Sequence, residues 1–368
     1  MDQVEKIVST GWRDGSSIAC VSGMPVEDMG AGNFRLKPGR SIDDERRSAV
    51  IGLQKSLSAV TPAATAFMIH DGLVLGNGFV VSTADGLVRE SRYLVKNLER
   101  RVELSLRDET VVLDDSIAWI IAGNASSKSN YWHWFAQILP AILHSRDLGK
   151  SLGRTRFGVI TESLKEWQIE SLLVLGINRD SIVEINQFQH ARAATLFYSS
   201  FLSGVSVFAD NIYRREIRRI FIDWAGQNNA APGKIVVSRR DTNKRPLMNE
   251  DLLHAELALS GFKVMTGGSL TLREQIQAFQ GASVVIAPHG AGSTNVLFGR
   301  KGALYIELGQ LSYPNAGPLS LCKSSEMLAW IDLFEDDGKG QSTGGWKASI
   351  ELVRDTVAIA MHDLVSEL

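Results

Sequence analysis

The sequence predicts an α/β fold with a parallel, doubly wound sheet in its C-terminal half and a β-rich extension at its N-terminus. Three observations lead to this prediction. Short β-branched runs alternate with amphipathic helix patterns from residue 233 to residue 308. A similar strand–helix–strand alternation occupies residues 156–185. From residue 66 to residue 95, short β-like runs are separated by glycines, which is typical of a β-meander.

Composition is that of a soluble globular protein, with 44% hydrophobic and 22% charged residues. A chain of 368 residues exceeds the usual limit for a single core, so we expect two domains or one domain with large additions. Lys plus Arg number 39 and Asp plus Glu 41, a net charge of −2. This balance gives no reason to expect nucleic acid as a partner.

Cysteine content and the N-terminus indicate the compartment. Only Cys20 and Cys322 are present, which predicts unpaired thiols in a reducing environment. No run of 18 apolar residues occurs, and the N-terminus carries Asp2, Glu5 and Lys6 in place of an apolar signal core. We therefore expect a cytoplasmic protein. Peripheral association with the inner face of the membrane is compatible with these observations.

The first third of the chain gives few signals before residue 66. Residues 29–40 predict a polar loop, and residues 43–47 a charged turn or helix start. The meander from residue 66 should contain three or four strands, with glycines at its turns. Residues 111–123 then predict a buried strand or a pair of strands.

Residues 130–145 predict a helix that faces the core, with Pro140 within it. Asn130 is suited to cap its start. His133 lies four residues before Gln137, so the two side chains share one face of the helix. The apolar residues that recur at helical spacing are Trp134, Ile138, Leu139 and Ile142.

Two strands and two helices are expected between this helix and residue 226. The strands lie at residues 156–161 and 181–185, on either side of a helix at residues 167–175 that Gly176 closes. A second amphipathic helix covers residues 213–224, and residues 227–233 predict a linker at a domain boundary. The arginines expected on the polar side of the second helix are Arg214, Arg215, Arg218 and Arg219.

The C-terminal half alternates more regularly. Strands are expected at residues 235–237, 262–265, 284–286 and 303–308. One helix opens at residues 249–251 and closes at Gly261, and a capping box of Thr271 and Glu274 opens the next, which carries Ile276 and Phe279. The tail from residue 320 should be helical, interrupted by a flexible loop at residues 338–345. In such a sheet ligands bind beyond the carboxyl ends of the strands.

The stretch SVVIAPHGAGSTNVLF, residues 283–298, is the strongest candidate for a ligand site. It begins as a buried strand that Pro288 ends, then turns through two glycines towards a helix that residues 293–295 are suited to cap. Unpaired N–H groups at a helix start favour a phosphate, although the same glycines also fit an ordinary tight turn. The residues expected to contact the anion are His289, Gly290, Ala291, Gly292, Ser293, Thr294 and Asn295.

Several other chemistries are disfavoured. The pattern GxSxG occurs at residues 149–153, after a predicted helix, and at residues 340–344, in a predicted loop, so neither is the strand–turn–helix of a nucleophile elbow. The scattered histidines and cysteines offer no HxxxH or CxxC pair for zinc. The D-x-D pair with which many nucleotide-sugar enzymes hold a divalent metal does not occur. Handling of a phosphate without a metal remains. Arg239 and Arg240 at a strand end, with Arg245, can stabilise a diphosphate leaving group, although Arg239 and Arg240 also fit a surface pair.

Taken together, these segments resemble the family-61 glycosyltransferases. The resemblance covers about residues 66–310, and HGAG followed by TN and LF is fairly specific, more so after an upstream N-x-x-H-W helix. The segments are NYWHWFAQILP from residue 130, SRR from residue 238, Arg245 with Asn249 and Glu250, Gly261–Phe262, Leu270–Gln275, HGAGSTNVLF from residue 289, and Glu307.

The resemblance implies a GT-B architecture, in which two Rossmann-like domains face a cleft and the second holds most of the nucleotide sugar. It also implies inverting transfer without a metal or other cofactor, usually from a UDP-sugar such as UDP-xylose or UDP-N-acetylglucosamine. The acceptor of signal-free bacterial members would be a growing surface polysaccharide, so the partners would be a nucleotide sugar, a glycan acceptor and the polysaccharide-synthesis complex. The domains expected are residues 1–110 (β-rich extension), 111–228 (acceptor side), 229–312 (nucleotide sugar) and 313–368 (a helical segment packing back across the domains).

Substrate contacts are expected on this basis from Asn130, Trp134, the three arginines, residues 289–295 and, at the ribose, Glu307. One position departs from the family pattern N-x-x-H-W-x-x-D-x-x-P, because Gln137 stands where an acid is usual. An amide does not accept a proton near neutral pH, so His133 is the candidate base and Gln137 would orient a sugar hydroxyl.

The same departure leaves a second hypothesis open: a catalytically silent nucleotide-sugar-binding or scaffold protein, which would bind nucleotide without turnover. A nicotinamide-dependent oxidoreductase is weaker, since no acidic residue follows a GxGxxG by about 20 residues.

Overall fold

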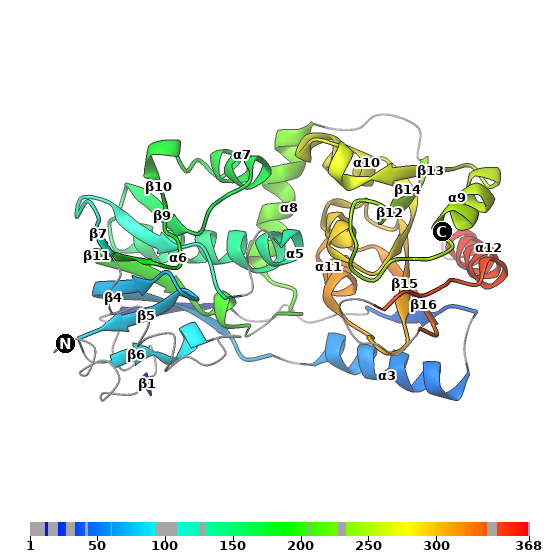
Figure 1. Cartoon of the computed structure of the whole chain (residues 1–368), viewed down its shortest axis with the longest axis horizontal. Helices are drawn as coiled ribbons and strands as arrows, with labels where there is room; N and C mark the ends of the chain where they lie inside the picture. Colours follow the sequence, from blue (N-terminus) through cyan, green and yellow to red (C-terminus); the bar gives the residue numbers. More distant parts are fainter. Residues whose placement is uncertain are drawn as a thin grey trace. The chain divides into compact units, whose positions relative to one another are not determined.

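The computed structural model describes residues 12–13, 21–26, 34–40, 43–59, 61–84, 86–92, 109–125, 130–204, 207–226, 233–336 and 344–366. The chain divides into two compact units, each built on one sheet (Figure 1). Unit 1 comprises Met1–Asp28, Thr61–Val207 and Asn211–Ile217, and unit 2 comprises Met29–Val60, Phe208–Asp210 and Arg218–Leu368. The helix α8 (Ile212–Ala225) carries the chain from one unit to the other.

Unit 1 contains a mixed sheet of ten strands, eight of them in the order β1-β6-β5-β4-β11-β8-β9-β10, with β2 beside β4 and β7 beside β11. The run β11-β8-β9-β10 is parallel, and β4, β5 and β6 continue it as antiparallel strands. The predicted parallel unit and the predicted β-rich region therefore share one sheet. The strands are β1 (Trp12–Arg13), β2 (Val21–Val26), β4 (Ala64–Leu75), β5 (Val80–Thr83), β6 (Gly86–Val88), β7 (Glu109–Val112), β8 (Ala118–Ile121), β9 (Phe157–Thr161), β10 (Ile182–Glu184) and β11 (Gln189–Ser199).

The predicted meander differs from the observed strands at one turn. The turn expected at Asp71 and Gly72 is wrong, because both residues lie within the 12-residue strand β4. Arg192 on the neighbouring strand donates to both carboxylate oxygens of Asp71, at 2.8 and 2.6 Å. A side chain at residue 72 would place its Cβ 2.7 Å from Leu196, so here glycine permits close packing and not a reversal.

The helix predicted from residue 130 is one helical segment made of α5 (Tyr131–His133), the π-helical turn η3 (Trp134–Ile138) and α6 (Leu139–Ser151). Pro140 has no N–H group to donate to the carbonyl of Ala136. That carbonyl instead accepts a hydrogen bond from Nε of Arg214, at 3.0 Å. Arg214 is fully buried, so the prediction that it lies on the polar side of its helix is wrong. The other helices of unit 1 are η1 (Arg89–Arg92), α7 (Glu166–Val174), η4 (Arg179–Ser181) and η5 (Ser200–Ser203).

Unit 2 contains six parallel strands in the order β13-β12-β14-β15-β16-β3. The four strands predicted between residues 233 and 310 are all present, and the capping box of Thr271 and Glu274 is formed. The strands are β3 (Leu36–Pro38), β12 (Gly233–Ser238), β13 (Phe262–Thr266), β14 (Ala282–Pro288), β15 (Leu304–Gln310) and β16 (Leu328–Phe334). The helices are α3 (Asp44–Ser58), α9 (Glu250–Leu259), η6 (Gly267–Ser269), α10 (Leu272–Gln280), η7 (Ala291–Phe298), α11 (Gly317–Ser325) and α12 (Ile350–Ser366).

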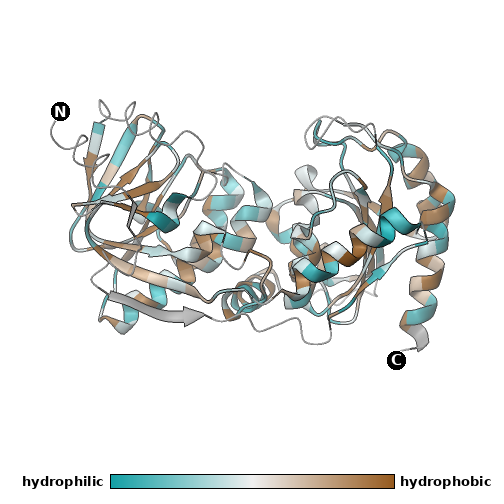
Figure 2. Ribbon diagram, turned by 90° about the horizontal axis from the view of Figure 1, so that it is seen from below, coloured by the Kyte–Doolittle hydropathy of each residue, from teal (hydrophilic) through white to brown (hydrophobic). Residues whose placement is uncertain are grey.

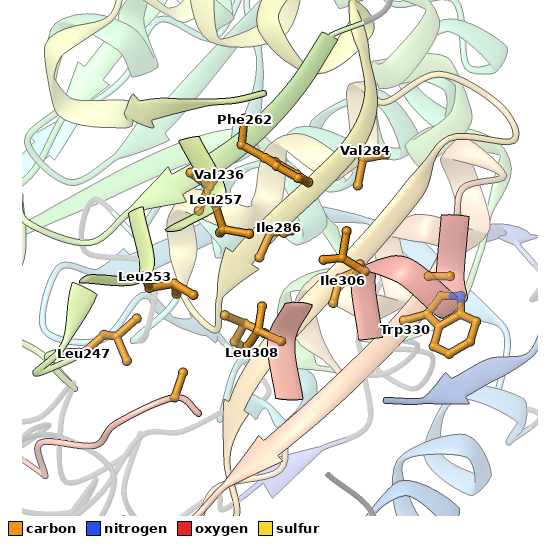
Figure 3. Close-up of a cluster of buried hydrophobic side chains, with 14 of the residues drawn as sticks. Val236, Leu247, Leu253, Leu257, Phe262, Val284, Ile286, Ile306, Leu308 and Trp330 are labelled. Carbon is orange, nitrogen blue, oxygen red and sulfur yellow. The ribbon is translucent and has the colours of Figure 1, made fainter. Parts of the chain in front are cut away.

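The core of unit 2 explains this order of strands. Alternate residues such as Val236, Ile286 and Ile306 line one face of the sheet, where α9 and α12 cover them (Figure 3). The helices α10 and α11 contact β14 and β16 and lie on the opposite face (Figure 1). Of these helices, α10 buries Leu272, Ile276 and Phe279 at helical spacing, whereas α11 is buried along its whole length. Figure 2 shows hydrophilic and hydrophobic residues on the helical ribbons.

Two strands of unit 2 differ from the prediction. The strand β16 lies in a tail that was expected to be helical, and β3 lies in the expected loop at residues 29–40. Among the described residues of the tail, those of α11 and α12 are helical. Most of the predicted linker at residues 227–233 and of the predicted loop at residues 338–345 falls outside the described residues. Within the described part of the chain, no helix is long and apolar enough to cross a bilayer.

Candidate active site

Three polar residues of unit 2 meet at the carboxyl ends of adjacent strands. Arg239 directly follows β12, His289 directly follows β14, and Glu307 lies on β15 in register with Ala287. Since β12, β14 and β15 are neighbours and parallel, these residues share one edge of the sheet. This is the edge at which the sequence predicts a ligand site.

Arg239 is a buried cation in this group, with 8% of its surface exposed. Its Nη1 donates to the carbonyl of His289 at 2.8 Å, and its Nη2 donates to the carbonyl of Lys244 at 2.6 Å. Nε has no hydrogen-bond partner among the described residues. Burial, and after it the charge of Arg245, lowers the pKa of Arg239 to about 10, so the side chain is still charged at neutral pH.

Gly290 brings this cation against the start of a helix. A Cβ atom at residue 290 would overlap Nη1 of Arg239, so only glycine allows the approach. Gly290 is the N-cap residue of η7, and Ser293 N–H donates to its carbonyl at 3.1 Å. The N–H groups of Ala291 and Gly292 donate to no other described residue. The positive end of η7 and the guanidinium of Arg239 therefore form a place for an anion.

The residues expected to cap this helix lie inside it. Ser293, Thr294 and Asn295 are at most 1% exposed, and η7 begins at Ala291, so the capping prediction is wrong. Ser293 Oγ donates to the carbonyl of Pro288 at 3.2 Å, and Asn295 Nδ2 donates to Gln275 at 2.9 Å. These side chains fix the turn from within. Of the predicted set, His289, Ala291 and Gly292 have exposed surface.

His289 and Glu307 form a close pair at this turn. Nδ1 of His289 lies 2.6 Å from Oε1 of Glu307, and Tyr305 donates its hydroxyl to Oε2 of Glu307 at 2.9 Å. Glu307 is 1% exposed, and its carboxylate is occupied by protein partners. The sequence instead predicts a contact between Glu307 and the ribose. Burial, and after it the charge of Glu307, raises the pKa of Tyr305 well above its ordinary value, which keeps the hydroxyl a donor.

Two further arginines and one tyrosine complete the surroundings. Arg240 is exposed and forms an ion pair with Asp251. This agrees with the second alternative from the sequence, in which Arg240 is a surface residue. Arg245 lies over the ring of Tyr313, 5.3 Å from its centroid, and the ring of His289 meets the same ring edge-on at 5.6 Å. Tyr313 was not predicted as a site residue. It follows β15 in a short loop, and only the aromatic side chain itself could have drawn attention to it.

A second candidate group lies in unit 1, where His133 Nδ1 is 2.5 Å from Gln137 Oε1. Gln137 is 1% exposed, and its Nε2 donates to the carbonyl of Phe201 at 3.3 Å. Both ends of the amide are thus used within the protein, whereas the sequence predicts a contact with a sugar hydroxyl. This orientation makes Oε1 an acceptor, so Nδ1 of His133 carries the hydrogen and Nε2 holds the lone pair of the neutral ring.

The environment of His133 favours the neutral ring. Burial lowers the pKa of His133 below its ordinary value, and the hydrogen bond that its Nδ1 donates to Gln137 offsets this only in part. No hydrogen bond to Nε2 is formed by any described residue. The π-helical turn η3 begins at the next residue, and such turns often occur at functional sites.

Asn130 and Trp134 have local structural partners. Asn130 caps the helix, accepting hydrogen bonds from the N–H groups of Trp132 and His133 at 3.0 and 3.3 Å. Trp134 is 1% exposed and donates to the hydroxyl of Ser171 at 2.7 Å, which places it in the core. Among the described residues, no three His, Cys, Asp or Glu side chains gather as metal ligands would.

Comparison with known proteins gives one match. Residues 131–306 match the model of the family described as Glycosyltransferase 61. The matched segment begins just before His133 and ends one residue before Glu307, so it includes the helix in unit 1 and the anion site in unit 2. None of the curated proteins compared with the chain matches it.

Proposed function

We propose that this chain, a glycosyltransferase by virtue of its family-61 domain at residues 131–306, transfers a sugar with inversion from a nucleoside-diphosphate donor to a glycan hydroxyl. The donor is a UDP-sugar and the acceptor a growing surface polysaccharide of a bacterium. The proposal includes the GT-B arrangement, peripheral association with a polysaccharide-synthesis complex in the cytoplasm, and the domain division at residues 110, 228 and 312. The observation that carries it is Arg239, buried against the start of η7.

The donor side rests on charge. One charge-assisted hydrogen bond contributes about 1.5–3 kcal/mol, and a helix end adds about 0.3–1 kcal/mol. Arg239, the N–H groups of Ala291 and Gly292, and the η7 dipole together supply positive charge where a diphosphate would leave. Stabilisation of this size supports transfer without a metal ion.

The acceptor side rests on His133. In an inverting displacement the acceptor oxygen forms its bond to C1 of the sugar as the bond from C1 to the diphosphate oxygen breaks. The hydroxyl proton must leave as that bond forms. The lone pair on His133 Nε2 can take it, because Gln137 holds the hydrogen on Nδ1. A neutral histidine is the form needed, and burial keeps its pKa low.

A nucleotide screen tests the proposal. Thermal unfolding would be followed with UDP-, GDP-, CMP- and dTDP-sugars, since ligand at 100 times its Kd adds about 2.7 kcal/mol of stability. The sugar that stabilises best would then be offered with polysaccharide acceptors. We expect a UDP-sugar to bind and to be transferred.

The matched variants are Arg239→Lys, which keeps the charge but loses the forked guanidinium, and Arg219→Lys, which changes an exposed arginine paired with Asp223. Only the first should weaken the stabilisation by UDP. Binding without transfer to any acceptor would identify the silent binding protein instead, and no stabilisation by any nucleotide sugar would reject the proposed function.

A further inference from the structure

We propose that His289 is a second catalytic residue, which donates a proton from Nε2 to the departing diphosphate, and that Glu307 is the positioning residue that holds it. This inference rests on the proposed function, because it assigns the leaving-group side of the same reaction. It gives unit 2 an acid in addition to the fixed charge of Arg239.

The geometry of the pair is that of an oriented histidine. Nδ1 of His289 lies 2.6 Å from a carboxylate oxygen of Glu307 that is almost completely buried. Tyr305 holds the other carboxylate oxygen at 2.9 Å, so the carboxylate cannot turn away from the ring. A carboxylate only accepts hydrogen bonds, and therefore Nδ1 carries a hydrogen.

The backbone of His289 is tied to the candidate anion site. Its carbonyl accepts from Nη1 of Arg239 at 2.8 Å, and Gly290 follows directly as the N-cap residue of η7. Its side chain is 12% exposed, and no described residue forms a hydrogen bond with Nε2. Nε2 is thus the one ring nitrogen left for a ligand, on the residue that joins the guanidinium of Arg239 to the start of η7.

Glu307 supplies the charge that an acid at this position needs. A protonated imidazole beside Arg239 would add a second cation to a buried place, which is unfavourable without a negative partner. The carboxylate of Glu307 is that partner, at hydrogen-bond distance. Removing its charge while keeping its shape should therefore weaken the acid more than it disturbs the fold.

The proposed step is balanced. The bond from C1 of the sugar to the diphosphate oxygen breaks, and its electron pair remains on that oxygen. The proton on Nε2 of His289 moves to a diphosphate oxygen and leaves a neutral ring, which still donates from Nδ1 to Glu307. The proton lost by the acceptor goes to His133 under the proposed function, so proton donor and proton acceptor are different histidines.

Two substitutions separate the ring nitrogens. His289→Asn places an amide N–H near the position of Nδ1, so Glu307 keeps a donor while Nε2 is lost. His289→Gln places an amide near the position of Nε2, so the ligand keeps a neutral donor while Glu307 loses its partner. Glu307→Gln removes the negative charge at nearly constant shape. Matched controls are His362→Asn and Glu351→Gln, both at exposed positions of α12.

Two measurements test the proposal: calorimetric binding of inorganic pyrophosphate, and sugar transfer with the donor found in the screen. We expect His289→Asn to bind pyrophosphate about ten-fold or more weakly than the wild type. We expect kcat to fall by roughly 10²–10⁴ in His289→Asn. Glu307→Gln should lower kcat with little change in the KM for the donor, because it acts through His289.

The failures of the two proposals can be told apart. Wild-type kcat and pyrophosphate affinity in a folded His289→Asn variant would overturn the role of His289 and leave the proposed function intact. If His289→Asn does not fold, His289→Gln and Glu307→Gln decide, because wild-type kcat in either contradicts the proposal. A wild-type protein that neither binds pyrophosphate nor transfers sugar would reject the proposed function itself.

Discussion

The substitution Gln137→Glu tests the base in the strictest way. It keeps the length of the side chain that accepts from Nδ1 of His133 at 2.5 Å, but replaces a neutral amide by a carboxylate in a position that is 1% exposed. The present neutral partner leaves burial as the main effect on the pKa of His133, which is lowered. A carboxylate would favour the protonated ring instead.

The distance between the two side chains sets the size of the expected pKa change of His133. Two unit charges about 4 Å apart interact by about 4 kcal/mol at an effective dielectric constant of about 20. At about 1.4 kcal/mol per pKa unit this is an upper limit of about 3 units, and neighbouring opposite charges usually shift a pKa by about 1–3 units. The pKa of His133 would then rise. Because the base works only when neutral, the acidic limb of kcat/KM should move to higher pH by as many units as the pKa rises.

The assay combines a pH profile of kcat/KM with an NMR titration of His133. The second oxygen of the new carboxylate would face the carbonyl of Phe201, where Gln137 now donates, so we expect a loss of stability of about 1–3 kcal/mol. Gln54→Glu in α3 adds the same charge at another glutamine and should leave the profile unchanged. If the NMR titration shows the raised pKa while the acidic limb stays in place, His133 is not the base.

Four further predictions follow from the same contacts. His133→Ala should lower kcat by roughly 10²–10⁴ with UDP affinity retained, and wild-type turnover would place the base elsewhere. Gly290→Ala should weaken UDP binding about ten-fold in calorimetry, because the new Cβ displaces the guanidinium of Arg239, and an unchanged affinity would remove that contact from the site. Arg239→Ala should weaken UDP binding at least as much and also lower the melting temperature, since it leaves two carbonyls without their donor; the sequence alone predicts little change in melting temperature. Transfer should survive excess EDTA, whereas complete loss with rescue by manganese would contradict a metal-independent mechanism.

The parallel strands of unit 2 could be predicted because each is marked by residues within the strand itself or beside it in sequence. β12 and β14 contain β-branched runs, β15 is buried at every residue, and the capping box of Thr271 and Glu274 marks a helix start within four residues. β3 carries no such signal, because three residues become an edge strand only through their pairing with β16. β16 itself alternates weakly and follows a helix, so its pattern did not separate strand from helix.

Residue spacing along the sequence predicts only part of the candidate site. A separation of four residues puts His133 and Gln137 on one helix face, but which end of the amide meets the ring depends on Phe201, 64 residues away in sequence. The burial of Arg214 likewise depends on the carbonyl that Pro140 leaves unpaired. Glycines mark the turn at η7, yet the close approach of Arg239 that requires Gly290 comes from a different strand.

The two histidines of the proposed mechanism differ in the partner of the same ring nitrogen. His133 gives its Nδ1 hydrogen to a neutral amide, and His289 gives its own to a buried carboxylate. A neutral partner fixes the tautomer without adding charge, which suits a group that must accept a proton. A carboxylate compensates a positive ring, which suits a group that must donate one. Exchanging the partners, with Gln137→Glu and Glu307→Gln in one chain, should therefore impair transfer by about the product of the two single effects, because each partner acts on its own histidine. A double variant no worse than the more damaging single variant would contradict the assignment of the two partners to two separate proton transfers.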